Sequence, residues 1–113
     1  MALHHASPGE VIDLDLPAQA AGTPGTKAIV KTDRFEAIRL VLEQGDAIPA
    51  HQVASQITLH CLQGTANVKL ADRTLPLHPD QWVFFAANTV HGIDAVTDAV
   101  LLMTIMLPIA PDT

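Results

Sequence analysis

The sequence predicts an all-β fold in one domain, of the sandwich or barrel type. Apolar and polar residues alternate with a period of two in several short runs, and clusters of Gly, Pro, Asn and Asp interrupt these runs about every 8–12 residues. No stretch of useful length shows the 3.6-residue period of an amphipathic helix. The length of 113 residues is typical of a single domain.

The runs between the turns are predicted as strands. Residues 10–16 alternate Asp with Ile and Leu, and residues 35–43 also alternate between two faces. A turn is predicted over residues 44–49, QGDAIP. Almost every residue of 99–107 is apolar, so this strand is predicted to be central or covered on both faces. The other predicted strands are residues 57–62, 66–70, 75–77, 82–85 and 92–95.

A segment with Gly and Pro separates the first predicted strand from the others. Residues 17–26 form this predicted linker. We therefore expect an N-terminal strand and linker over residues 1–26 and the main β domain over residues 27–113. A lone strand on a linker is suited to pairing with a neighbouring copy of the chain.

The composition is 49% apolar and only 16% charged, against about 25% charged in typical domains. Sparse charge leaves apolar surface that a second copy would cover, so we expect a homodimer. The net charge is −6 and the basic residues are scattered, which excludes the basic stripe of a nucleic-acid-binding protein. No signal peptide or membrane-spanning run is visible, and the single cysteine excludes an intrachain disulfide. We expect a cytoplasmic protein without nucleic-acid or membrane partners.

Histidines are the main candidates for chemistry, because nucleophile, phosphate-loop and zinc-protease motifs are absent from the sequence. His51 and His91 each follow a turn at the start of a strand. Imidazole serves as a metal ligand or as a general base. His60 is expected on the strand face opposite Ile57, where it is packed or interfacial, and His78 is expected in a solvated turn.

Aromatic residues gather in one predicted strand. Trp82 and Phe84 share one face of it, and Val83 and Phe85 share the other. We interpret them as core or dimer contacts. Cys61 is expected on an inner face as a small, inert apolar residue.

The spacing of the two histidines resembles the motifs of the cupin superfamily. The first motif, G-x5-H-x-H-x3-E-x6-G, falls on Gly45, His51, Val53, Ile57 and Gly64. The second, G-x5-P-x-G-x2-H-x3-N, falls on Asp80, Ala86, Asn88, His91 and Ala95. The resemblance covers about residues 33–108 and implies a single-domain cupin barrel, the double-stranded β-helix or jelly roll.

The same resemblance implies a ligand pocket inside the barrel near His51 and His91, with Ile57 and Gln56 beside them. Metal-binding cupins usually offer three His and one Glu, but Val53 and Ile57 replace two of these residues here. His51 and His91 would therefore hold a divalent transition metal, such as Fe, Mn, Ni or Zn, only weakly.

Three functional hypotheses follow. The first is a small-molecule-binding cupin of unknown ligand. The second is a metal-dependent cupin enzyme of the dioxygenase, isomerase or decarboxylase type, with the metal on His51 and His91. The third is a metal-free enzyme that resembles sugar epimerases and uses a histidine as general base.

Overall fold

The computed structural model describes residues 5–14 and 26–108, and over these ranges the chain forms strands and no helix. None of these residues belongs to a helix that is long and apolar enough to cross a membrane. The described strands are β1 (Lys27–Lys31), β2 (Phe35–Leu42), β3 (Ala47–Gln52), β4 (Gln56–Gln63), β5 (Ala66–Leu70), β6 (Thr74–Leu77), β7 (Trp82–Phe85), β8 (Val90–Ala95) and β9 (Ala99–Met106).

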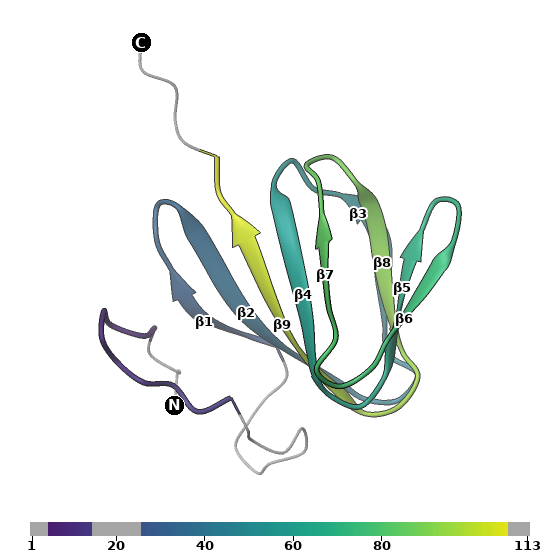
Figure 1. The fold of residues 1–113 in the computed structure, drawn as a ribbon, viewed down its shortest axis with the longest axis horizontal. Coiled ribbons are helices and arrows are strands. Elements are labelled where there is room, and N and C mark those ends of the chain that lie inside the picture. Colours follow the sequence, from purple (N-terminus) through teal and green to yellow (C-terminus); the bar gives the residue numbers. More distant parts are fainter. Residues whose placement is uncertain (1–4, 15–25, 109–113) are drawn as a thin grey trace.

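These strands form two antiparallel sheets, as Figure 1 shows. Sheet A has the strand order β1-β2-β9-β4-β7, and sheet B has the order β3-β8-β5-β6. From β2 onward the chain crosses from one sheet to the other at every connection except the one between β5 and β6, which both lie in sheet B. The prediction of an all-β jelly roll is confirmed.

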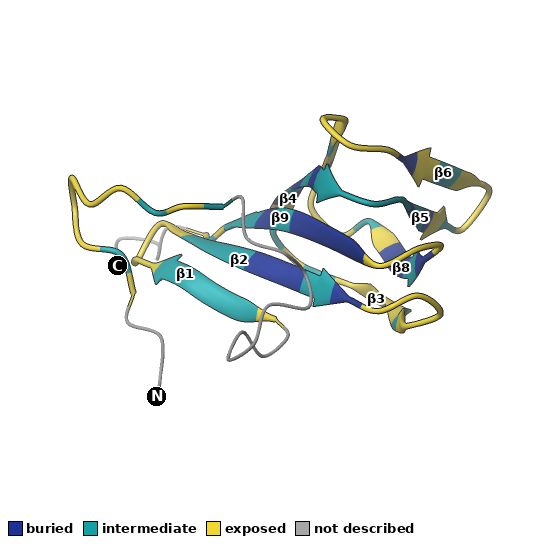
Figure 2. Ribbon diagram, turned by 90° about the horizontal axis from the view of Figure 1, so that it is seen from below, coloured by how far each residue is buried: buried dark blue, intermediate teal, exposed yellow. Residues whose placement is uncertain are grey.

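The core lies between the sheets and consists mainly of aliphatic side chains. Leu59 of β4, Val68 of β5 and Leu101 of β9 are fully buried, and Figure 2 shows buried stretches on strands of both sheets. The predicted central position of the last strand is confirmed, because β9 lies between β2 and β4. Val100 and Leu101 point to opposite faces of β9, and both are fully buried.

β1 is missing from the sequence prediction, and the strand predicted to start at His51 is wrong in its bounds, because His51 lies near the end of β3. β3 begins at Ala47, inside the predicted turn over residues 44–49. Pro49 has no N–H to donate, but β3 is an edge strand of sheet B, where a proline is tolerated. Pro76 lies in β6, the other edge strand of the same sheet.

The predicted N-terminal strand over residues 10–16 is wrong for its described part, because residues 10–14 form no strand. Residues 15 and 16, and all of the predicted linker except Thr26, lie outside the described residues. The chain instead turns before this segment, where the backbone N–H of Ser7 donates to Glu10 Oε1 at 2.9 Å. Val11 is 93% exposed. Alternation provides two faces, but a strand also needs a neighbour for its hydrogen bonds.

Two turn glycines adopt the left-handed conformation, in different surroundings. Gly64 follows β4 with φ +72°, and a Cβ at this position would overlap the carbonyl oxygen of Asp98. Gly45 precedes β3 with φ +89°, and no atom lies within 4 Å of a Cβ there.

We predict that Gly64→Ala lowers the free energy of unfolding by about 3 kcal/mol, because backbone strain adds to a backbone clash. The matched variant Gly45→Ala carries only the strain and should lose about 1 kcal/mol. Urea unfolding of both variants measures the difference. Equal losses would show that the contact with Asp98 relaxes without cost.

Candidate functional site

A β-bulge in β3 brings the two candidate histidines to the same face of sheet B. Ile48 pairs with Ile93, and His51 pairs with His91, so β3 holds one more residue than β8 between these two pairs. Ile48 and His51 are three positions apart, so in a regular strand, where side chains alternate, they would point to opposite faces. The bulge reverses that alternation, so His51 lies beside His91.

Gly92 makes room for this bulge. A Cβ on Gly92 would lie 2.9 Å from the Ala50 nitrogen and 3.0 Å from the Ile48 oxygen, and both are backbone atoms of the bulged strand. Only glycine permits this approach without a shift of the backbone.

Three rings line up where the sheets meet. The His91 ring stacks on Phe85 of β7, with centroids 5.4 Å apart and an interplanar angle of 16°. The His51 ring lies on His91 at 5.2 Å and 43°. His91 is only 1% exposed, whereas His51 is exposed. The pair therefore connects the interior with the surface.

Both imidazole rings are oriented in the same way by the backbone. Nδ1 of His51 lies 3.1 Å from the Pro49 carbonyl oxygen, and Nδ1 of His91 lies 3.2 Å from the Thr89 carbonyl oxygen. A carbonyl oxygen only accepts, so each Nδ1 carries the proton and each neutral ring keeps its lone pair on Nε2. Nε2 of His91 is buried, and no described residue makes a hydrogen bond to it. A buried acceptor of this kind favours a ligand that donates to it.

Ile57 lies on the strand next to Phe85. It is buried in β4 and pairs with Phe85, the residue under the His91 ring. Val53, at another motif position, packs against the core. The stacking of Phe85 on His91 was not predicted from the sequence. Alternation along the strand had only placed Phe85 on the face opposite Trp82 and Phe84.

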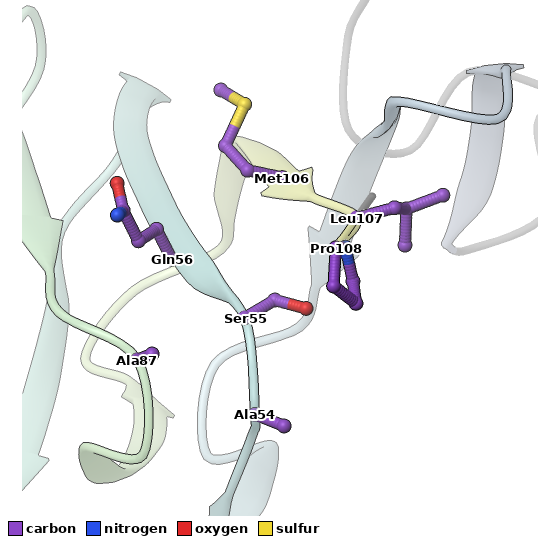
Figure 3. Close-up of a pocket in the computed structure, with 7 residues that line it drawn as sticks. All are labelled: Ala54, Ser55, Gln56, Ala87, Met106, Leu107 and Pro108. Atoms are coloured by element: carbon purple, nitrogen blue, oxygen red, sulfur yellow. The ribbon is translucent and has the colours of Figure 1, made fainter. Parts of the chain in front are cut away.

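Gln56 lies elsewhere. It is exposed and pairs with Met106 of β9 on the outer face of sheet A. Together with Ser55, Ala87 and Pro108, these two residues line a cavity of about 260 Å³ (Figure 3). The structure thus brings together His51, His91 and Ile57 and places Gln56 on the other side of the sheet.

A complete metal site is not present in the described ranges, where no group of three or more His, Cys, Asp and Glu side chains is close enough to hold a metal ion. The site offers two imidazole nitrogens and no carboxylate. This donor set does not fit a transition metal held by the protein alone.

The remaining candidate residues are separated from this site. His60 lies on the outer face of β4, opposite Leu102 and Trp82 of the neighbouring strands, as alternation predicts. His78 is exposed, and its Nδ1 lies 3.2 Å from the Thr65 hydroxyl.

Comparison with known proteins assigns residues 38–107 to the family described as Cupin domain. No match to a curated protein was found. Among solved structures, a conserved protein of unknown function from Streptococcus pyogenes superimposes with a TM-score of 0.77 at 18% identity, over 97% of both chains. A cupin superfamily protein from Desulfitobacterium hafniense also has a TM-score of 0.77, at 16% identity, over 96% of this chain and 100% of that one. An RmlC-like cupin from Desulfovibrio desulfuricans has a TM-score of 0.73 at 20% identity, over 88% of this chain and 100% of that one. At these identities the structural matches show the fold.

We predict that Gly92→Ala separates the two histidine rings, because the new Cβ pushes the β3 bulge away. The variant should lose about 1–3 kcal/mol of unfolding free energy, and the NMR resonances of His51 and His91 should move. Asp94→Ala is the matched control on the same strand and face. Asp94 makes a surface ion pair with Lys69 at 2.6 Å, so its loss should cost less than about 1 kcal/mol. Unchanged histidine resonances in Gly92→Ala would contradict the role of Gly92.

We predict that Cys61 is unreactive in the folded protein. The Cys61 thiol is fully buried and lies 3.2 Å from the Gly64 carbonyl oxygen. Burial raises the pKa of this thiol, and the negative charge of Asp80 adds to the effect, against an opposing backbone hydrogen bond from Gln63. The neutral thiol therefore stabilises the fold at neutral pH, and this contribution is lost as the pH rises through the raised pKa.

Thiol labelling with a disulfide reagent at pH 8 measures this property. The native protein should react roughly 100-fold more slowly than the same protein in urea. Equal rates in the two states would show that Cys61 is accessible.

Proposed function

The chain belongs to the cupin family, and on this premise we propose that it binds a small molecule at the end of the barrel where His51 and His91 meet. One observation carries the proposal. Nε2 of His91 is a buried acceptor that receives no hydrogen bond from the described residues. Leaving such a group unpaired costs about 1–3 kcal/mol, and a bound donor group would recover that free energy.

The chemistry around the histidines indicates the class of ligand. Three paired residues on the adjacent strands β7, β4 and β9 provide apolar contacts. In this order they are Phe85, Ile57 and Ile105. The histidines provide two acceptor nitrogens. We therefore propose a small ligand with a hydroxyl or N–H group for the histidines and an apolar part for these side chains.

We propose that a ligand reaches Nε2 of His91 past the His51 ring, which lies 5.2 Å from the His91 ring. The His51 side chain is exposed and is oriented by a hydrogen bond to the backbone of its own strand. Exposed side chains change rotamer within picoseconds to nanoseconds. We propose that His51 rotates to admit the ligand and then binds it.

Proton transfer is a second candidate function, favoured by the orientation of the rings. Donation from Nδ1 to a backbone carbonyl leaves Nε2 of each histidine available as a general base. This corresponds to the metal-free, epimerase-like hypothesis. Exchange of a carbon-bound hydrogen of a bound compound with deuterium from solvent would support it.

We predict that neutral compounds with a hydroxyl or amide group and fewer than about 15 non-hydrogen atoms will include ligands of this site. Binding should shift the methyl NMR signals of Ile57 and Ile105. His91→Leu should weaken binding at least about tenfold, because it removes the acceptor while keeping an apolar side chain of similar size. His78→Leu is the matched control and should leave the affinity unchanged.

Compounds that bind His91→Leu and the unaltered protein equally would contradict the proposal. Elemental analysis and titration with Fe²⁺, Mn²⁺, Ni²⁺ and Zn²⁺ test the metal-dependent alternative. We expect less than about 0.1 equivalent of metal in protein purified without chelator. Stoichiometric metal that is lost in both His51→Ala and His91→Ala would favour the metal-dependent enzyme instead.

We also propose that the chain forms a homodimer, in agreement with its low content of charged residues. A cytoplasmic location is likewise proposed.

A further inference from the structure

The row of paired residues that begins beneath the His91 ring ends on two charged side chains. The row crosses sheet A in the strand order β7, β4, β9, β2 and β1, and its members are Phe85, Ile57, Ile105, Glu36 and Lys31. Figure 1 shows these five strands side by side. Residues that are directly paired across a sheet share a face. Glu36 and Lys31 therefore lie on the same inner face as the buried Ile57.

Charge on an inner face is exceptional in this chain. Across the nine described strands, Glu36 and Lys31 are the only charged residues on an inner face, and the neighbouring inner row of sheet A consists of Leu59, Met103 and Ile38 in its centre. Glu36 is half-buried, and Lys31 at the edge of the sheet is exposed. A charge that is partly removed from water is stabilised by a group of opposite charge.

The two charges lie directly opposite each other on β1 and β2. Within the described ranges they nevertheless form no ion pair with each other or with another side chain. The end of the row thus presents one carboxylate and one ammonium group at neighbouring positions. This combination is complementary to a zwitterion, whose own ammonium and carboxylate groups are also neighbours.

We propose that the site binds a free α-amino acid, with its ammonium group at Glu36 and its carboxylate at Lys31. This inference rests on the proposed ligand site and names the class of its ligand. The side chain of the amino acid extends over Ile105 and Ile57 and ends in a hydroxyl or N–H group that donates to Nε2 of His91. A zwitterion has no net charge, so the net charge of −6 on the protein does not repel it.

The length of the row sets the length of the ligand. Neighbouring strands lie about 4.8 Å apart, so Glu36 is roughly 14 Å from Phe85 along the sheet. A 4-hydroxyphenyl amino acid spans about 7 Å from its ammonium nitrogen to its hydroxyl oxygen, and a hydrogen bond at each end adds about 3 Å. Such a ligand reaches from Glu36 to the histidine above Phe85. Glycine and serine are too short to reach both ends.

Four compounds that share a 4-hydroxyphenyl group test the inference on the full chain at pH 7. L-Tyrosine carries both charges, tyramine only the ammonium group, 3-(4-hydroxyphenyl)propionate only the carboxylate, and 4-ethylphenol neither. Titrations followed by the methyl NMR signals of Ile57 and Ile105 measure each affinity. We expect L-tyrosine to bind about tenfold more tightly than 4-ethylphenol, with the other two compounds between them.

Two variants assign the charges separately. Glu36→Gln should weaken the binding of L-tyrosine and tyramine about three- to fivefold and leave the other two compounds unchanged. Lys31→Met should weaken L-tyrosine and the propionate by a similar factor and leave tyramine and 4-ethylphenol unchanged.

The matched controls are Glu43→Gln, directly after β2, and Lys27→Met, on the outer face of β1, where Lys27 pairs with Arg39. Neither control should change the affinity for any of the four compounds. Circular dichroism checks the fold of every variant.

The outcomes separate this inference from the proposed ligand site. Equal binding of all four compounds, with the loss in His91→Leu retained, would overturn the amino-acid ligand and leave the site in place. Tyramine or the propionate binding as tightly as L-tyrosine would show that one charge suffices and would also overturn it. Equal losses in Glu36→Gln and Glu43→Gln would contradict the role of Glu36. If none of the four compounds binds at about 1 mM, the amino-acid ligand is overturned. Binding of all four that is unaffected by His91→Leu would overturn the site itself.

Discussion

The close approach of the β3 backbone to Gly92 is the contact on which the histidine pair depends. It permits one extra residue in β3 and so reverses the direction of the side chains that follow. His51 thereby shares a face with His91, and the stack on Phe85 extends across the two sheets. The chemistry proposed for this end of the barrel thus rests on a backbone contact that involves no polar side chain.

The two faces of sheet A differ in what covers them. Its inner face supplies the aliphatic core, and part of its outer face stays apolar without being covered by any described strand. This division accounts for the low charge content of the chain. Residues that would be charged on an ordinary strand surface are here Thr, Trp, Phe and Met. The proposed binding site near the histidines and the apolar outer face of sheet A are therefore on opposite sides of the sheet.

Sequence patterns predicted the features that are local to one strand. The positions of Ile57 and His60 on opposite faces of β4 follow from period-two alternation, and the central place of the last strand follows from its nearly continuous apolar run. The bulge in β3 was not predictable in this way, because it depends on a contact between residues about forty positions apart. Residues 10–14 illustrate the opposite error, since alternation was present there and a neighbouring strand was not.

The position of β9 has a consequence for how the chain folds. Its partners β2 and β4 precede it by roughly forty to seventy residues, and it lies between them. Sheet A therefore cannot close until residue 106 has left the ribosome, and such long-range pairing is intrinsically slow. Until then, the inner faces of β2 and β4 are without their common neighbour. A nascent chain of this fold would expose aggregation-prone apolar edges throughout its synthesis, and its last strand would complete the core in one late step.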